Sequence, residues 1–167
     1  MAELMRVHGD AVFGFCLRMV HARDRADDLV QQVFLEAFRD LDSIEGSSPR
    51  AWLFGIAYHR CLDALKTRQH QLQLIENSEQ AMLGVEDPGR GMLEHVDRMQ
   101  LVAGLEECLR RLSPAVRATV LMRFQTGATY EEMEVKLGAT PDALQVRVAR
   151  ALPVLRRCLE KKGWSGE

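Results

Sequence analysis

Long apolar runs are missing from this 167-residue sequence. No run approaches the roughly 18–20 residues that a membrane-spanning helix needs. The N-terminal stretch Met1 to Arg6 also lacks the basic region and apolar core of a secretory signal. We therefore expect a cytoplasmic protein that is not itself in the membrane.

Cysteine and histidine are sparse, and neither occurs in a chemical motif. The cysteines are 45, 47 and 50 residues apart with no C-x-x-C pair: Cys16, Cys61, Cys108 and Cys158. This spacing argues against structural zinc and a redox dithiol, so we expect reduced, partly buried cysteines that act as small hydrophobic residues. H-E-x-x-H, G-x-S-x-G and glycine-rich phosphate loops are absent as well. The sequence predicts no enzyme active site, no metal, no cofactor and no small-molecule substrate.

Charge is nearly balanced overall but unevenly distributed. The chain has 22 basic and 24 acidic residues, which excludes a uniformly basic protein that coats nucleic acid. Residues 1–68 carry a net charge of −1, residues 69–104 carry −4 and residues 105–167 carry +3. Within 147–162, six basic residues stand against the single acid Glu160. The near-neutral total therefore conceals a basic C-terminal segment that can contact phosphates.

The hydrophobic pattern is helical almost throughout, without strand-like alternation. It predicts helices over about 2–21 and 26–41, and a third that opens at Ser48 and Pro49. Residues 84–91 contain three glycines and one proline, a composition typical of a linker. Further helices are expected through 102–112, from Pro114 and from Thr129. The last begins at Pro141 and reaches about residue 162, with a kink or break at Pro153.

The segment from Thr129 onward has the layout of a helix-turn-helix. Thr129 and Glu132 form a capping-box pattern, Gly138 marks a tight turn, and Thr140 repeats the N-cap. The helix after this turn is basic, as expected of a helix that lies in the major groove of DNA. An ordinary solvated helix face is the alternative, and this pattern alone does not decide between the two.

Two stretches in this order resemble the sigma-70 family of RNA polymerase sigma factors, in its extracytoplasmic-function (ECF) group. The first lies within 27–68 and includes Pro49-Arg-Ala-Trp-Leu-Phe-Gly-Ile-Ala-Tyr-His-Arg-Cys-Leu-Asp63, which resembles region 2 of that group. The second begins at Leu112-Ser-Pro-Ala-Val-Arg-Ala-Thr-Val-Leu-Met-Arg-Phe124 and continues through the helix-turn-helix, which resembles region 4.

The resemblance implies an all-α protein of two small helical domains joined by a flexible linker. Residues 1–70 would be region 2, residues 71–92 the linker and residues 93–167 region 4. It further implies a non-enzymatic factor that directs bacterial RNA polymerase to promoters in response to stress or another signal. The expected partners are the beta-prime clamp and beta flap of the polymerase core, promoter DNA and an anti-sigma factor, which could tether the protein to the membrane.

The resemblance also assigns residues to three surfaces. Polymerase binding falls to Asp28, Gln31, Gln32 and Glu36. Recognition and melting of the downstream (−10) promoter element falls to Ser43, Glu45, Ser47, Phe54, Tyr58, His59, Arg60, Asp63 and Lys66. Reading of the upstream (−35) element falls to Thr140, Asp142, Gln145, Val146, Arg147, Ala149 and Arg150. The alternatives are a solvated face for the first set and core packing for the aromatic residues, which we favour for Trp52 over Tyr58.

The sequence also departs from the family pattern. His59 stands where the family usually has asparagine, while Gln145 and Val146 replace a cation and a hydroxyl in the recognition helix. Glutamine can pair with adenine and valine can contact the thymine methyl, so a different base sequence could be read. Glu134 stands near the expected helix crossing, where it must reach solvent or a cation.

Two other functions remain open at the level of the sequence. One is a sigma-like decoy that binds an anti-sigma factor without initiating transcription. The other is a helix-turn-helix repressor, which leaves the match over 27–68 unexplained. An anti-sigma partner would cover exposed apolar side chains, for which the sequence offers Leu35, Met122 and Met133.

Overall fold

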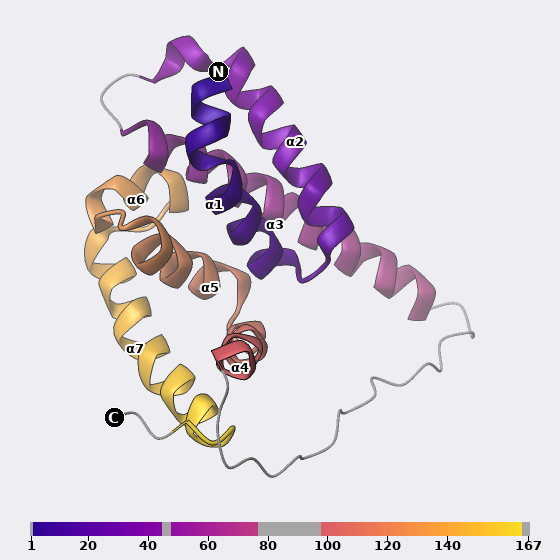
Figure 1. Ribbon diagram of the computed structural model, residues 1–167, viewed down its shortest axis with the longest axis vertical. Coiled ribbons are helices and arrows are strands. Elements are labelled where there is room, and N and C mark those ends of the chain that lie inside the picture. Colours follow the sequence, from indigo (N-terminus) through magenta and orange to yellow (C-terminus); the bar gives the residue numbers. More distant parts are fainter. Residues whose placement is uncertain (1, 45–47, 77–97, 165–167) are drawn as a thin grey trace.

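The computed structural model describes residues 2–44, 48–76 and 98–164, and all regular elements in these ranges are helices (Figure 1). The N-terminal half contains α1 (Ala2–Val20), α2 (Arg23–Arg39), the short 3₁₀ helix η1 (Leu41–Ser43) and α3 (Pro49–Glu76). The C-terminal half contains α4 (Arg98–Arg110), α5 (Pro114–Leu121), the π-helical segment η2 (Met122–Thr126), α6 (Tyr130–Leu137) and α7 (Pro141–Glu160). The predicted all-α class is confirmed.

Helix α3 continues to Glu76, so the first residues of the expected 71–92 linker are helical. The rest of that linker, including the glycine-rich 84–91, lies outside the described residues. The division into 1–70, 71–92 and 93–167 therefore stays a prediction.

The helix ends follow the predicted capping chemistry. The Ser48 hydroxyl accepts the Ala51 N–H at 3.1 Å, and the Thr129 hydroxyl accepts the Glu132 N–H at 3.2 Å. The Glu132 carboxylate accepts the Thr129 N–H in return, which completes the capping box. The turn after α6 uses Gly138 at φ 62°, a left-handed conformation that glycine adopts without a Cβ clash. These local signals fix where α3, α6 and α7 begin and how α6 and α7 are joined.

The three long helices of the N-terminal half pack on one another. Their core positions follow helical spacing, and Val12, Phe15, Val33, Leu53 and Phe54 are all buried. Phe15 and Phe54 meet edge to face with their ring centroids 5.4 Å apart, a favoured aromatic geometry. The bundle therefore positions the solvent-facing sides of α2 and α3 rigidly.

The C-terminal half is held together by apolar packing and one covalent bond. Buried Met133, Leu144 and Leu155 join α6 to α7 and α7 to α5. Cys108 of α4 is disulfide-bonded to Cys158 of α7, with an S–S distance of 2.08 Å. The expectation of reduced cysteines is therefore wrong for this pair, because α4 and α7 are brought together by the fold and not by sequence spacing. Cys16 and Cys61 are free and buried, as expected.

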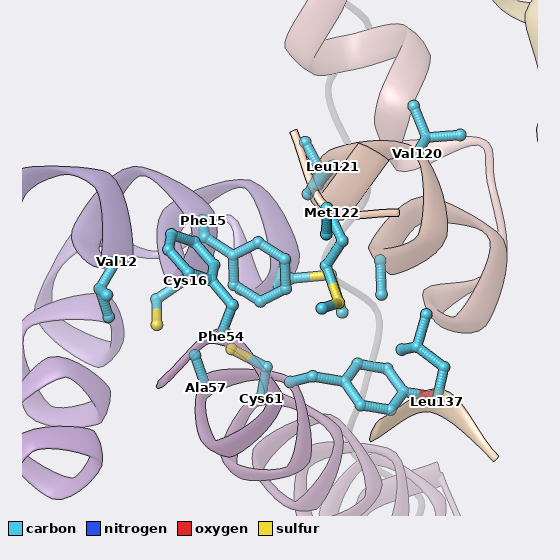
Figure 2. Close-up of a cluster of buried hydrophobic side chains, with 14 of the residues drawn as sticks. Val12, Phe15, Cys16, Phe54, Ala57, Cys61, Val120, Leu121, Met122 and Leu137 are labelled. Carbon is cyan, nitrogen blue, oxygen red and sulfur yellow. The ribbon is translucent and has the colours of Figure 1, made fainter. Parts of the chain in front are cut away.

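The two halves share one continuous hydrophobic cluster (Figure 2). Side chains of α1 and α3, among them Phe15 and Phe54, meet Leu121, Met122 and Leu137 from the C-terminal half. Contacts run between α1 and both α4 and α5, and between α3 and α6. The structure thus shows two helical units packed against each other, an arrangement that sequence periodicity does not reveal.

Two further expectations are corrected. Pro153 does not end the first half of α7, which runs on to Glu160, because the proline lies on the exposed side of a helix anchored by Leu144, Val148 and Leu155. The kink expected there as the other possibility stays a prediction. Met122 and Met133 are fully buried and offer no surface to a partner, because they fill the cores between helices. Leu35, in contrast, is 58 % exposed.

Candidate functional site

The first candidate surface is the polar face of α2. Asp28, Gln31 and Gln32 are exposed on it, while Glu36 is half-buried and accepts a 2.5 Å hydrogen bond from Arg60 of α3. The apolar residues Leu35 and Phe38 are 58 % and 65 % exposed near the same end of the helix. This combination makes the end of α2 a candidate surface for a protein partner.

Residues assigned to polymerase and to the −10 element meet in one cleft between α2 and α3. The cleft has a volume of about 370 Å³, and its walls include Asp28 and Gln32 from α2 and Arg60 and Asp63 from α3. The ion pair between Glu36 and Arg60 adjoins these walls and raises the pKa of Arg60 through its hydrogen bond. The fold therefore joins two residue sets that the sequence treated as separate surfaces.

The predicted −10 residues of α3 divide between two faces of the helix. His59, Asp63 and Lys66 are exposed and Arg60 is half-buried, so these four can be reached from solvent. Phe54 and Tyr58 are instead buried, at 0 % and 5 % exposure. Trp52 is also buried, at 5 % exposure, which agrees with the core role favoured for it. Tyr58 is also 5 % exposed, so in this structure, with the two halves packed together, it is as buried as Trp52.

Tyr58 lies beneath the C-terminal half. Burial raises the pKa of its phenol, and the positive charge of Arg147 on α7 partly opposes that rise. The Tyr58 ring also contacts the imidazole of its neighbour His59, with centroids 5.2 Å apart. An aromatic residue of the −10 set and a cation of the −35 set are thus neighbours in this structure.

The remaining −10 candidates precede α3. Ser43 is the last residue of η1, six positions before α3 begins at Pro49. Glu45 and Ser47 lie outside the described residues.

The second candidate surface is the start of α7. Buried Leu144 and Val148 hold this helix against the rest of the C-terminal half. The opposite side is left to solvent, with Arg147 half-buried at its edge. The exposed residues include every other member of the −35 set: Thr140, Asp142, Gln145, Val146, Ala149 and Arg150.

This surface has the chemistry of a base reader. The Thr140 side chain caps the helix by accepting the Ala143 N–H at 3.3 Å. Gln145 offers a paired donor and acceptor, Val146 an apolar contact and Arg150 a cation for phosphate or guanine. Glu134 on the preceding helix is exposed, so it reaches solvent as the sequence required. The helix-turn-helix geometry is therefore intact despite this substitution.

Sequence reasoning did not find the residues that tie the halves together. The guanidinium of Arg117, only 6 % exposed, donates to the carbonyl oxygens of Leu109, Leu112 and, across the halves, Met19. Burial is the main reason why the pKa of Arg117 is lowered, and nearby Arg110 adds to this effect. The sequence did contain a signal for this role, because an arginine stands inside the apolar run of α5. A cation buried there needs buried hydrogen-bond acceptors.

A wide apolar groove is lined by residues of α1, α4, α5, η2 and α7. It has a volume of about 970 Å³, and its lining includes Arg18 of α1, Leu105 of α4, Phe124 of η2 and Leu152 of α7. Phe124 and Leu152 are 61 % and 44 % exposed.

In the described ranges, no group of histidine, cysteine and acidic residues could hold a metal ion. No helix in those ranges is long and apolar enough to cross a membrane.

Comparison with protein families gives two matches, in chain order. The model for Sigma-70 region 2 matches residues 4–71, and the model for Sigma-70, region 4 matches residues 103–152. The first match covers α1, α2 and most of α3, and the second ends within α7, after the predicted reading face. Both candidate surfaces therefore fall inside the matched regions.

Similar curated proteins are ECF RNA polymerase sigma factors. SigE of Mycolicibacterium smegmatis is 29 % identical over 159 residues, which cover 95 % of this chain and 61 % of SigE. SigK of Mycobacterium tuberculosis is 27 % identical over 159 residues, covering 89 % of this chain and 80 % of SigK. The chain thus spans less than two thirds of the length of SigE.

Solved structures share the fold at low sequence identity. The sigma factor RpoE of Bartonella quintana, in complex with the anti-sigma factor NepR, has a TM-score of 0.75 and 23 % identity, covering 95 % of this chain and 96 % of RpoE. CnrH, in complex with the cytosolic domain of CnrY, has a TM-score of 0.66 and 22 % identity, covering 96 % of this chain and 87 % of CnrH. The packing of the two halves therefore has parallels among known folds.

Proposed function

Because this chain belongs to the ECF group of the sigma-70 family, we propose that it directs bacterial RNA polymerase core to specific promoters. The observation that carries the proposal is the ordered pair of region 2 and region 4 matches, each of which contains an exposed candidate surface. Sigma factors supply specificity and perform no bond chemistry, so the protein needs no catalytic residue or cofactor.

The N-terminal half would contact both the polymerase and the −10 element. The exposed polar face of α2, with Asp28, Gln31 and Gln32, would bind the beta-prime clamp. On α3, His59 and Lys66 would meet the DNA backbone, and aromatic side chains would stack with unpaired bases, which have two π-faces. The ion pair of Glu36 with Arg60 would hold these two helix faces in register.

The C-terminal half would read the −35 element with α7 while also contacting the beta flap. Gln145 is suited to an adenine edge and Val146 to a thymine methyl, whereas Arg150 can neutralise a phosphate or pair with guanine. All three side chains are exposed on one side of the helix. We therefore propose that the substitutions at 145 and 146 change which bases are read and do not abolish DNA binding.

An anti-sigma factor is the third proposed partner. RpoE, which shares this fold, was solved with the anti-sigma factor NepR, and CnrH was solved with the cytosolic domain of CnrY. The open apolar groove over α4 and α7 offers the kind of surface that an amphipathic helix covers. We propose that the protein works in the cytoplasm, where its anti-sigma factor could hold it at the membrane.

Reconstituted transcription tests this function. Core polymerase plus the protein should give promoter-dependent transcripts, and Arg150→Ala should lower promoter affinity by about tenfold, because one contact of this kind is worth about 1–3 kcal/mol. Gln145→Ala should instead relax base preference at one −35 position. Arg111→Ala, which alters an exposed cation outside α7 and outside the basic segment 147–162, is the matched control and should change neither.

The same assay separates the alternatives. A decoy would bind an anti-sigma factor yet give no transcript, and a repressor would bind an operator without polymerase. Absence of any binding to core polymerase would contradict the proposed function.

A further inference from the structure

The apolar groove over α4, η2 and α7 has the composition of a small-molecule site. Its volume of about 970 Å³ lies at the upper end of the range of roughly 300–1,000 Å³ that is typical of such sites. Most of the described residues that line it are apolar, and none of them is acidic. Buried Leu109, Val120 and Leu155 form part of its wall, while Phe124 and Leu152 are exposed in it. A hollow of this kind is suited to an apolar ligand.

The groove follows α7 for about three turns. Its α7 wall includes, at spacings of three or four residues, Ala149, Leu152, Arg156 and Leu159. This stripe from 149 to 159 is roughly 15 Å long, because each residue of a helix adds about 1.5 Å. An extended alkyl chain of about twelve carbons spans roughly 14 Å, since its bonds of about 1.5 Å meet at the tetrahedral angle. The groove therefore matches one linear alkyl chain in length.

The charged residues among those that line the groove are two arginines, Arg18 of α1 and Arg156 of α7. Arg156 is 68 % exposed and donates to the Glu160 carboxylate at 3.0 Å, so its charge is already paired. Arg18 is half-buried, and its Nη1 atom donates to Gly14 O at 3.2 Å. Within the described ranges Arg18 has no carboxylate partner, so it is the better anchor for an anion.

A second N–H donor lies beside Arg18. A Cβ atom built on Gly14 would lie 3.0 Å from Arg18 Nη1 and 3.3 Å from Gln125 Nε2, so both nitrogen atoms approach the same point of α1. The Nε2 atom of Gln125 also donates to Ala11 O at 2.9 Å, which holds the amide in place. The missing side chain of Gly14 leaves room for both groups. This edge of the groove is therefore positive and rich in donors, which suits an anionic head group.

We propose that this groove binds a free long-chain carboxylate, whose alkyl chain lies along α7 and whose head group pairs with Arg18. The ligand is a free molecule and not a membrane lipid, because a groove encloses a single chain whereas membrane binding uses an apolar helix face laid on the bilayer. A bound carboxylate would exclude the anti-sigma helix proposed above from the same surface. Its binding does not depend on promoter recognition, so it can hold or fail separately from the proposed function.

Tryptophan fluorescence of the whole chain tests this assignment. Trp164 lines the groove, whereas Trp52, the other tryptophan, is buried in the N-terminal half. Decanoate, dodecanoate and tetradecanoate, each below its micelle concentration, should shift the emission saturably to shorter wavelength. Affinity should rise about fourfold per added methylene until the chain fills the groove. Trp164→Phe should abolish the shift and leave binding measurable by calorimetry.

Three variants examine the two ends of the ligand. Arg18→Gln should weaken dodecanoate binding about tenfold, as loss of one charge-assisted hydrogen bond predicts, and should leave dodecanol binding unchanged. Arg39→Gln alters an exposed arginine of α2 outside the groove and is the matched control, which should change neither affinity. Leu152→Asp places a carboxylate at an exposed position of the groove and should weaken dodecanoate more than dodecanol. Circular dichroism checks that each variant folds.

Several results would overturn the proposal. One is the lack of a saturable shift with any of the three chain lengths. Another is equal affinity for dodecanoate in Arg18→Gln and in the unaltered chain, which would remove the head-group assignment. Sedimentation distinguishes two other occupants. Dimers of the ligand-free chain that Leu152→Asp disperses would assign the groove to a second copy, and binding to phosphatidylglycerol vesicles that the same variant abolishes would assign it to a membrane surface.

Discussion

At the scale of the residue, Arg117 shows how a cation can be buried without an acid. Its guanidinium donates to four carbonyl oxygens, those of Met19, Leu109, Arg110 and Leu112. Three of these belong to the end of α4 and the turn after it, where the last carbonyls of a helix carry partial negative charge. The arginine therefore ends α4, stabilises the turn into α5 and joins α1 to the C-terminal half.

His21 is the second unusual residue, because its position at the end of α1 lowers the pKa of its imidazole. It adopts φ 53°, and its Nε2 atom is buried without a hydrogen-bond partner among the described residues. Burial, followed by the charges of Arg117, Arg110 and Arg68, lowers the pKa of His21 from 6.5 to about 4. The folded protein thus holds this imidazole neutral at pH values where the unfolded chain protonates it.

This lowered pKa predicts acid sensitivity. The contribution of His21 to stability is complete above pH 6.5 and is lost as the pH falls toward 4, because the unfolded state then binds the extra proton. We expect the unfolding free energy to drop by about 1 kcal/mol more between pH 7 and pH 5 than it does in His21→Asn, after allowance for solvent screening. Asparagine tolerates the left-handed conformation and does not titrate. Urea unfolding of both proteins at the two pH values measures the difference, and parallel pH dependences would refute it.

At the scale of the element, α4 is attached to α7 more firmly than to any neighbour. The Cys108–Cys158 disulfide links the C-terminal ends of the two helices. Just after the end of α7, Lys162 donates a 2.5 Å hydrogen bond to the Glu107 carboxylate of α4. This hydrogen bond lowers the pKa of Glu107. Helix α4 supplies part of the wall of the apolar groove and the carbonyls that Arg117 binds, so its attachment supports both features.

Removal of this disulfide should destabilise the protein. It closes a loop of 50 residues, and a cross-link of that length is worth about 2–4 kcal/mol through the unfolded chain. We expect Cys158→Ala to lower the unfolding free energy by that amount, measured by urea denaturation. Reductant should produce a similar loss in the unaltered protein and no further loss in Cys158→Ala. An unaltered protein that is indifferent to reductant would contradict the expectation.

Most element boundaries could be predicted because their causes are local. Ser48, Thr129 and Thr140 cap helices by hydrogen bonds that span three residues. Gly138 adopts the left-handed conformation of the turn between α6 and α7. The break expected at Pro153 does not occur, because packing can hold a helix together across a proline. Buried side chains on both sides of Pro153 hold α7 in one piece.

At the scale of the whole molecule, the small net charge of the C-terminal half limits how tightly the free protein can bind DNA. The net charge of +3 over residues 105–167 is modest, and Arg147 is half-buried against the N-terminal half. The net attraction of the free protein to DNA is therefore weak, although Arg150, Arg156 and Arg157 are exposed, and most promoter affinity should come from polymerase contacts. The total charge of −2 accords with promoter binding that depends on the polymerase, as proposed above.

Weak binding of the free protein to DNA follows. We expect the isolated protein to bind promoter duplex no more tightly than about 1 µM at physiological salt, which is the range of non-specific binding. Its affinity should fall steeply between about 50 and 200 mM salt. The complex with core polymerase should bind the same duplex far more tightly. Fluorescence anisotropy measures both, and nanomolar binding by the isolated protein would overturn the expectation.

The sequence by itself determined the helices, their caps, the helix-turn-helix and the family, because each depends on residues close together in the chain or on motifs in a fixed order. Tertiary structure decided which of these surfaces meet. It bonded Cys108 to Cys158, buried Arg117 among carbonyls and placed α6 over Gly55 and Tyr58. These contacts join residues 50 to 98 positions apart, and the hydrophobic periodicity of the sequence does not predict them. They depend on how the helices pack once they have formed.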